Sequence, residues 1–184
     1  MPEESLEDLI NQSKHSSFAA FKKLVELHQD MVYRLTFRLL ANEHDAEDMV
    51  QEIFIRVWEN LQKYNSGYAF STWVYKIATN MCYDMLKSKQ YINKSKNEAI
   101  DDLAVTCELF TDPCENEIDN KQLANIIKTL TMQLSPKQKL VFTLSDIEAL
   151  STREISQITG LSAARIKSNL YLARQHIRKK LEQI

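Results

Sequence analysis

Turn-forming residues are scarce in this sequence of 184 residues, which contains two glycines and three prolines. A β-sheet protein of this length needs many tight turns, and tight turns draw heavily on these two residue types. The few present stand where a break is useful: Gly67 lies in a polar stretch, Gly160 separates two short helical patterns, and Pro136 follows a serine at a helix start. The scarcity therefore predicts an all-α fold.

Residues that bind metals or form disulfides are also few. The three cysteines are Cys82, Cys107 and Cys114. Their number is odd and their spacing matches no metal or redox motif, which favours reduced thiols. The four histidines are scattered: His15, His28, His44 and His176. The sequence also lacks a phosphate-cradling glycine loop and a pocket signature with paired carboxylates, so we predict no cofactor, no metal ion and no catalytic residues.

A long hydrophobic run is missing as well. No stretch of the sequence is apolar enough over the length of a membrane-spanning helix, and the N-terminal residues do not follow the pattern of a signal peptide. We therefore expect a cytoplasmic protein without membrane insertion.

Charge is small in total but unevenly distributed, with a net of −2. Residues 163–184 contain six Lys or Arg and one acid, a net of +5, and residues 74–96 contain five Lys and one Asp, a net of +4. Residues 97–120 contain eight acids and no base, a net of −8. The whole molecule is thus no basic DNA-coating protein, and the two local basic patches need a specific explanation.

Apolar residues recur at helical spacing in three N-terminal segments. They predict one helix over about 17–41, a second that begins near Asp45, and a third over about 71–89. His28 lies on the apolar face of the first helix, where we expect a core residue and no ligand. The pattern predicts an N-terminal extension, a helical domain, a flexible acidic linker and a C-terminal helical domain, at residues 1–16, 17–95, 96–120 and 121–184.

The C-terminal region has the pattern of a helix-turn-helix. Capping boxes begin at Ser135 and Ser151, Gly160 permits a sharp turn at positive φ, and Ser162 can cap the next helix. A helical hairpin with a solvated basic face would share the charges, but the concurrence of cap, turn glycine and mixed polar face favours a DNA-reading helix. That face consists of Arg165, Lys167, Ser168, Asn169, Tyr171 and Arg174.

Taken together, these motifs resemble the extracytoplasmic-function (ECF) group of bacterial sigma factors, the promoter-recognition subunits of RNA polymerase. The N-terminal match runs from Asp45 to Trp58 and continues from Phe70 to Asn80. The C-terminal match consists of Leu134–Gln138, Glu154–Ser156, Gly160–Ser162 and Ile166–Ser168. These blocks occur in the family's order and spacing, and the resemblance covers nearly the whole chain beyond the first fifteen or so residues, except the linker.

The resemblance implies two contact surfaces in the N-terminal domain. Asp48, Gln51 and Glu52 match positions that dock on the clamp coiled coil of the polymerase largest subunit; without the resemblance, a solvated acidic face is the simpler interpretation. The patch after Tyr64 looks like the reader of the −10 promoter element, where a flipped base stacks on aromatic rings and cations hold phosphates. Its predicted residues are Tyr68, Trp73, Lys76, Asn80 and Lys87, with Lys89 as a further cation. Core packing remains the alternative role of Trp73.

The resemblance also implies that the helix-turn-helix reads the −35 promoter element through the six polar residues of its second helix. Among them, Lys167, Ser168 and Tyr171 match base or backbone contacts, and Arg174 matches a phosphate contact. The sequence departs from the family at Asn169 and Leu172, where arginine is frequent, so phosphate binding should be weaker and Asn169 can favour an adenine. The acidic linker is open to two interpretations: imitation of a nucleic acid in the RNA exit path, or a simple tether.

The leading hypothesis is a dissociable initiation factor that is a monomer when free. Its implied partners are core RNA polymerase, which supplies the catalysis, promoter DNA and, as the family's usual inhibitor, an anti-sigma factor. The alternative is a stand-alone helix-turn-helix regulator that uses residues 1–95 as a sensor or dimerisation domain and binds a palindromic site. An enzyme is the least supported hypothesis, because no catalytic constellation is visible.

Overall fold

The computed structural model describes residues 5–67, 69–97, 126 and 129–182, and these residues form only helices, turns and irregular segments. The N-terminal unit contains α1 (Leu6–Lys14), α2 (Phe18–Leu40), α3 (Glu43–Asn60), the short 3-10 helix η1 (Leu61–Lys63) and α4 (Phe70–Asn97). The C-terminal unit contains α6 (Pro136–Phe142), the π-helical turn η2 (Thr143–Ile147), α7 (Thr152–Thr159) and α8 (Ala163–Leu181). The predicted all-α fold with a C-terminal helix-turn-helix is confirmed.

Helix α1 was not predicted, because the first sixteen residues were interpreted as an extension. Ser5 caps α1 in a reciprocal capping box with Asp8, which satisfies backbone N–H groups at the helix start. Leu9 and Ile10 are buried in the main hydrophobic cluster, and α1 packs against α2. The Lys14 ammonium donates a hydrogen bond to the Tyr64 carbonyl at 2.7 Å. The extension is therefore a packed part of the N-terminal unit.

Helix α4 is longer than predicted and continues to Asn97, whereas the sequence pattern suggested an end near Lys89. No glycine or proline lies between residues 90 and 97 to stop the helix, and Gln90, Lys94 and Lys96 are good helix formers. The predicted start of the linker at residue 96 thus falls inside a helix. The rest of the predicted linker lies outside the described residues.

The core of the N-terminal unit forms where α2, α3 and α4 meet. Leu35, Ile53 and Val74 are fully buried there. His28 belongs to the same interior, as predicted: its Nδ1 lies 2.8 Å from the Leu24 carbonyl, and its ring meets Phe70 edge-on at 5.2 Å between centroids. Within the part of the chain that the structure describes, every helix is too short or too polar to cross a membrane.

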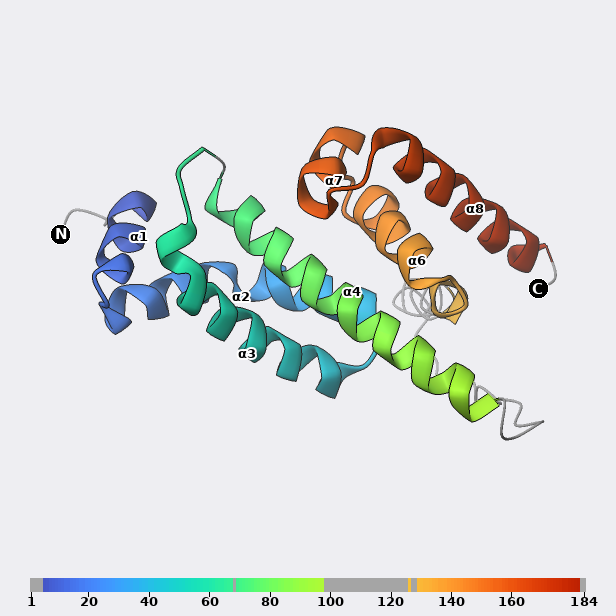
Figure 1. Ribbon diagram of the computed structural model, residues 1–184, viewed down its shortest axis with the longest axis horizontal. Helices are drawn as coiled ribbons and strands as arrows, with labels where there is room; N and C mark the ends of the chain where they lie inside the picture. Colours follow the sequence, from blue (N-terminus) through green and yellow to red (C-terminus); the bar gives the residue numbers. More distant parts are fainter. Residues whose placement is uncertain (1–4, 68, 98–125, 127–128, 183–184) are drawn as a thin grey trace, which may run out of the picture.

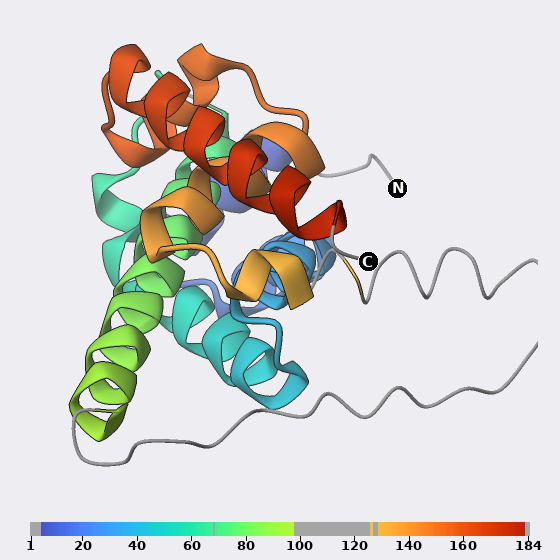
Figure 2. The same ribbon diagram turned by 90° about the vertical axis from the view of Figure 1, so that its right-hand side faces the viewer.

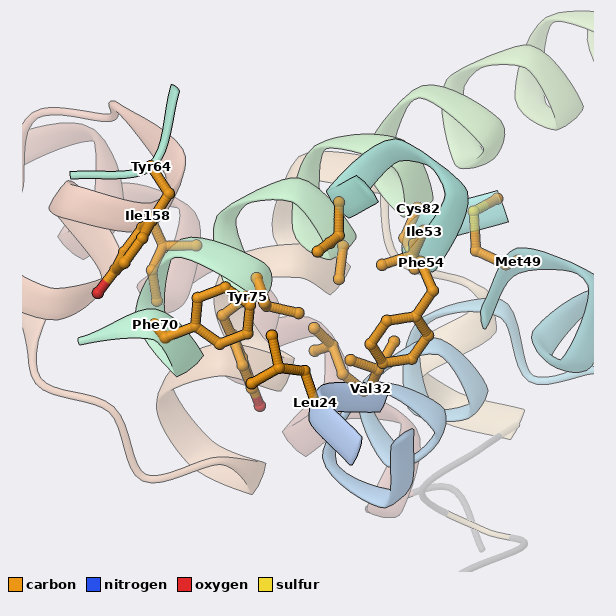
Figure 3. Packing of buried hydrophobic residues seen from close by; sticks show 14 of the residues in the cluster. Leu24, Val32, Met49, Ile53, Phe54, Tyr64, Phe70, Tyr75, Cys82 and Ile158 are labelled. Carbon is orange, nitrogen blue, oxygen red and sulfur yellow. The ribbon is translucent and has the colours of Figure 1, made fainter. Parts of the chain in front are cut away.

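The C-terminal unit packs directly on the N-terminal unit along α4. Figure 1 shows α4 running between α3 and the C-terminal helices, and Figure 2 shows α8 on the outside of the assembly. Contacts join α4 to both α6 and α7. Ile155 and Ile158 of α7 belong to the same buried cluster as Phe70 and Tyr75 of α4 (Figure 3). The two units therefore share one continuous core.

Candidate functional site

An acidic groove lies between α3 and α4, on the surface that carries the predicted polymerase contacts. Asp48, Gln51 and Glu52 are all exposed on α3. Asp48 and Glu52 line a cavity of about 500 Å³, and Gln51 is not part of its lining. The remaining lining residues are Asp45 and Met49 from α3, and Met81, Asp84, Met85 and Ser88 from α4. The groove thus combines four carboxylates with three flexible methionine side chains, a combination that suits a basic and partly apolar partner.

Lys89 of α4 is bound to Asp45, one of the residues that line this groove. Its ammonium forms an ion pair with Asp45 at 2.5 Å, which joins α4 to α3. Lys89 was predicted to be a phosphate-binding cation, but in the structure its charge is directed at a carboxylate. Asp84 and the methionines were not predicted as groove residues, because only the pairing of α3 with α4 brings them beside Asp48.

The predicted −10 residues of α4 lie along one stripe of the helix. Lys76, Asn80 and Lys87 are exposed and spaced by four and seven residues, so they share a face. The Lys87 ammonium lies 3.6 Å from an Asp84 carboxylate oxygen and 5.0 Å from the centroid of the Tyr83 ring. Tyr68, the remaining predicted aromatic of this surface, lies outside the described residues.

Trp73 is both a core-packing residue and the wall of a cavity, so both roles weighed for it have a structural basis. Its ring packs at 5.4 Å from Tyr64 and 5.7 Å from Phe70 between centroids. Trp73 also lines a cavity of about 260 Å³. The lining is formed by Lys63, Asn65, Thr72, Trp73 and Lys76, together with Gln157 from α7. Two cations, an indole ring and several amide or hydroxyl groups suit a base with its phosphate.

Local hydrogen bonds that were predicted from the sequence stabilise the helix-turn-helix. Ser135 and Ser151 form complete capping boxes with Gln138 and Glu154. The hydrogen bonds from Ser151 lower the pKa of the Glu154 carboxyl group. Gly160 ends α7 in the left-handed region at φ 70°, and Ser162 caps α8. These predictions are confirmed.

The turn between α7 and α8 contains further bonds that sequence analysis did not anticipate. The Ser156 hydroxyl donates to the Leu161 carbonyl at 2.7 Å, and the Leu161 N–H donates to the Thr159 hydroxyl at 3.2 Å. The Ser156 hydroxyl thus ties α7 to the residue that follows Gly160 in the turn.

The predicted −35 residues lie on the exposed side of α8. Arg165, Lys167, Ser168, Tyr171 and Arg174 are exposed, with Tyr171 at 66%. Asn169 is half-buried, and its amide donates to the Arg165 carbonyl at 2.7 Å. Leu181, the last residue of α8, is 51% exposed. On the inner side of the helix, Ile166 and Ala173 are buried, and Leu170 and Ile177 are half-buried.

Arg174 is already bound within the protein. Its guanidinium donates two hydrogen bonds to Asp146, at 2.8 and 2.6 Å. These bonds lower the pKa of the Asp146 carboxyl and raise that of Arg174. A phosphate contact through the same two N–H groups therefore requires an exchange of partners.

Side chains that could bind a metal ion or act as a nucleophile are few in the part of the chain that the structure describes. Among the described residues, no cluster of three or more His, Cys, Asp or Glu side chains could hold a metal ion. Cys82 is buried in the core, and burial raises the pKa of its thiol to about 12, so it stays protonated at neutral pH. Cys107 and Cys114 lie outside the described residues.

Comparison with known protein families gives two matches along the chain. The model described as Sigma-70 region 2 matches residues 24–91, and the model described as Sigma-70, region 4 matches residues 124–177. The ECF RNA polymerase sigma factor SigW of Bacillus subtilis is 31% identical over 179 residues, covering 95% of this chain and 96% of the relative. The ECF RNA polymerase sigma factor SigE of Mycolicibacterium smegmatis is 34% identical over 166 residues, covering 89% of this chain and 62% of the relative.

Solved structures show a similar fold. CnrH, solved in complex with the cytosolic domain of CnrY, superposes with a TM-score of 0.65 at 20% sequence identity, covering 95% of this chain and 96% of CnrH. The sigma factor RpoE, solved in complex with the anti-sigma factor NepR from Bartonella quintana, superposes with a TM-score of 0.63 at 20% identity, covering 88% of this chain and 96% of RpoE.

Proposed function

Because the chain belongs to the ECF RNA polymerase sigma factors, we propose that it binds core RNA polymerase and directs that enzyme to promoters for transcription initiation. The observation that carries this proposal is the order of its two helical units. A region 2 match and a region 4 match each fall on a folded unit with an exposed surface suited to its partner. A stand-alone regulator explains the helix-turn-helix but gives no account of the region 2 match.

The acidic groove between α3 and α4 is the proposed binding site for the polymerase. Asp48 and Glu52 border it, and Gln51 is exposed on the same helix. The carboxylates would attract a basic partner helix over some distance, and the three methionines would pack against its apolar side chains. The groove thereby extends the polymerase site beyond α3 to Asp84 and Met85 of α4.

The cavity beside Trp73 is the proposed −10 reader. An unpaired base could stack on the indole ring, while Lys63 and Lys76 bind the flanking phosphates. Asn80 follows one turn beyond Lys76 and has both a donor and an acceptor for a base edge. We further propose that the chain uses binding energy alone and that the polymerase performs all of the catalysis.

The exposed face of α8 is the proposed −35 reader, with Lys167, Ser168 and Tyr171 nearest the bases or the backbone. Helix α7 would lie across the DNA backbone while α8 enters the major groove. The Asn169 amide donates one of its two N–H groups to the Arg165 carbonyl, which leaves the other N–H and the amide oxygen for a base edge. This internal bond restricts the orientation in which the amide can reach a base.

An anti-sigma factor is the proposed inhibitor. The solved relative RpoE is in complex with one, and the acidic groove offers such a protein the same surface that the polymerase needs. One occupant would then exclude the other, which suits a factor that is held inactive until a signal removes the inhibitor.

Reconstituted transcription tests the proposed function. The purified chain is combined with bacterial core RNA polymerase on genomic DNA, and the transcript starts are mapped. We expect starts that share two upstream sequence elements and that are absent when either protein is omitted. Tight sequence-specific duplex binding by the chain alone, unchanged by core polymerase, would support the regulator instead.

A charge-reversal variant tests the polymerase surface in the same assay. Replacing Asp48, Gln51 and Glu52 together by lysine should abolish these transcripts and the co-purification of core polymerase. A matched control replaces Glu26, Gln29 and Asp30, which are exposed on α2, by lysine. Both triple variants change the net charge equally, because each replaces two acids and one glutamine. If the two variants gave equal amounts of transcript and of co-purified polymerase, the groove would be excluded as the polymerase-binding site.

A further inference from the structure

Lys14, the last residue of α1, is bonded to the segment that joins η1 to α4, and α1 packs against η1 (Figure 1). Its ammonium donates to the Tyr64 carbonyl at 2.7 Å and lies 5.5 Å from the centroid of the Tyr64 ring. In return, the side-chain amide of Gln62 donates to the Lys14 carbonyl at 2.5 Å. We call Lys14, Gln62 and Tyr64 the α1 anchor. Each segment donates to a backbone carbonyl of the other, so the two are tied in both directions.

The turn that follows Lys14 fixes the end of α1. Ser16 adopts the left-handed region at φ 67°, which is unfavourable for serine, and its N–H donates to the Ser13 carbonyl at 3.0 Å. The Ser17 N–H donates to the Gln12 carbonyl at 3.0 Å, and the Ser17 hydroxyl caps α2. The backbone that carries Lys14 is therefore held directly at the start of α2.

Tyr64 lies between the α1 anchor and the cavity of the proposed −10 reader. Its ring packs 5.4 Å from Trp73 between centroids, and Trp73 lines that cavity. The residues on either side of Tyr64 in the sequence, Lys63 and Asn65, line it as well. A displacement of Tyr64 would therefore move three residues of the cavity lining together.

One face of α1 acts on Tyr64 at two points. Glu7 and Lys14 share that face because their positions differ by about two helical turns. Burial, and then the charge of Glu7, raise the pKa of the Tyr64 hydroxyl, so the phenol stays neutral at physiological pH. The bond from Lys14 is charge-assisted, and such bonds are stronger than those between neutral groups.

We propose that Lys14 is a positioning residue of the proposed −10 reader: through the α1 anchor it holds Tyr64, and through Tyr64 it determines the shape of the cavity. Helix α1 then takes part in strand recognition although the cavity lining comes from other elements. This proposal rests on the proposed function for the role of the cavity. The effect of Lys14 on the cavity itself is measured without polymerase or DNA.

Tryptophan fluorescence tests this effect. The chain has two tryptophans, and Trp58 packs against Phe21 at 4.7 Å between centroids, so Trp58→Phe keeps an aromatic ring there and leaves Trp73 as the reporter. In this background Lys14→Met keeps a long side chain but removes the ammonium. It should raise the acrylamide quenching constant of Trp73 about two-fold, because the population shifts toward states in which Tyr64 no longer shields the indole. Lys14→Arg, which retains a charged donor, should restore the wild-type constant.

A second variant and a matched control accompany this measurement. Gln62→Met removes the amide that donates to the Lys14 carbonyl, and it should raise the constant in the same direction. The control is Lys22→Met, which removes the ammonium of the exposed Lys22–Glu26 pair on α2, with its atoms 3.9 Å apart, and should change nothing. Circular dichroism checks that each variant keeps its helicity. Quenching in Lys14→Met no greater than in the control would overturn the proposal.

Promoter opening tests whether the position of Tyr64 matters for strand recognition. Each variant is combined with core RNA polymerase on a promoter mapped by reconstituted transcription. Permanganate reactivity of unpaired thymines follows the opening, and gel retardation measures binding to the closed duplex. Lys14→Met should slow opening about five-fold, the effect of one net hydrogen bond on a rate. Duplex binding should stay unchanged because the −35 reader is untouched, and Lys14→Arg should restore the opening rate.

The two readouts separate positioning from a general effect on the fold. Equal losses of duplex binding and opening in Lys14→Met would overturn the proposal, because they would show a smaller folded fraction. An unchanged opening rate beside increased quenching would also overturn it, because Tyr64 would then move without consequence for the strand. If the wild-type chain gives no promoter-dependent transcript, the proposed function is wrong, and the quenching constant still decides whether Lys14 shapes the cavity.

Discussion

At Arg174, a residue assigned to DNA has an alternative partner inside the protein. Two hydrogen bonds to Asp146 hold its guanidinium, and that carboxyl has a lowered pKa, so it stays charged at neutral pH. Asn169 has a similar internal bond to Arg165. A DNA contact by either residue would compete with these internal bonds, which would lower the net gain of the contact.

Asp146→Asn tests this competition. The substitution removes the charge that holds Arg174, so the guanidinium becomes available to a phosphate. Binding of the full chain to a short mixed-sequence duplex should become more salt-dependent, with the logarithmic slope steeper by up to about one unit. Fluorescence anisotropy over a salt series measures the slope. Asp30→Asn, on the exposed face of α2, is the control, and identical slopes for the two variants would contradict the competition.

Among the helices, α1 shows how a short element acquires stability from its neighbours. Nine residues are too few for a stable isolated helix, and a capping box adds only a modest amount. The burial of Leu9 and Ile10 against the cluster supplies the rest. The helix exists because α2 offers a surface that covers its apolar side.

Leu9→Ala tests this dependence on packing. Leu9 is 4% exposed, so we expect a loss of about 2–4 kcal/mol in the free energy of unfolding, the usual cost of a buried leucine-to-alanine change. Leu6→Ala is the matched control on the same helix, because Leu6 is 42% exposed and should lose less than about 1 kcal/mol. Urea unfolding followed by circular dichroism measures both. Equal losses would show that α1 contributes through propensity alone.

Over the whole molecule, the shared core makes the two units thermodynamically dependent on each other. Ile155 and Ile158 of α7 lie in one cluster with Phe70 and Tyr75 of α4. Glu148 adds an ion pair with Arg38 and a hydrogen bond from the Tyr75 hydroxyl. Opening the units would expose apolar side chains on both, which opposes separation in water. Any partner that separates the units would have to bind the separated state tightly enough to offset this exposure.

Calorimetry tests the dependence. We expect the free chain to unfold in one transition, with a calorimetric enthalpy close to the van't Hoff enthalpy, because neither unit keeps its core intact without the other. Glu148→Gln should lower the transition temperature or broaden the peak. Two well-separated transitions in the wild type would contradict a shared core.

The sequence by itself determined the three long helices of the N-terminal unit and the helix-turn-helix, because their signals are local. Ser135 with Gln138, Ser151 with Glu154, and Gly160 each act within four or fewer residues, and the apolar spacing of each helix repeats along one segment. The surfaces that were predicted around Asp48, Lys76 and Lys167 are exposed. Their contacts with the polymerase and with promoter DNA remain predictions.

Only the tertiary structure decided which charged groups are paired. Lys89 meets Asp45, Arg174 meets Asp146, and Glu148 meets Arg38 across 44, 28 and 110 positions of sequence. It also decided that α7 lies against the cavity of Trp73. Charged side chains on helix surfaces carry no periodic signal that identifies their partners, because a partner is determined by how the helices pack and not by the spacing within one helix.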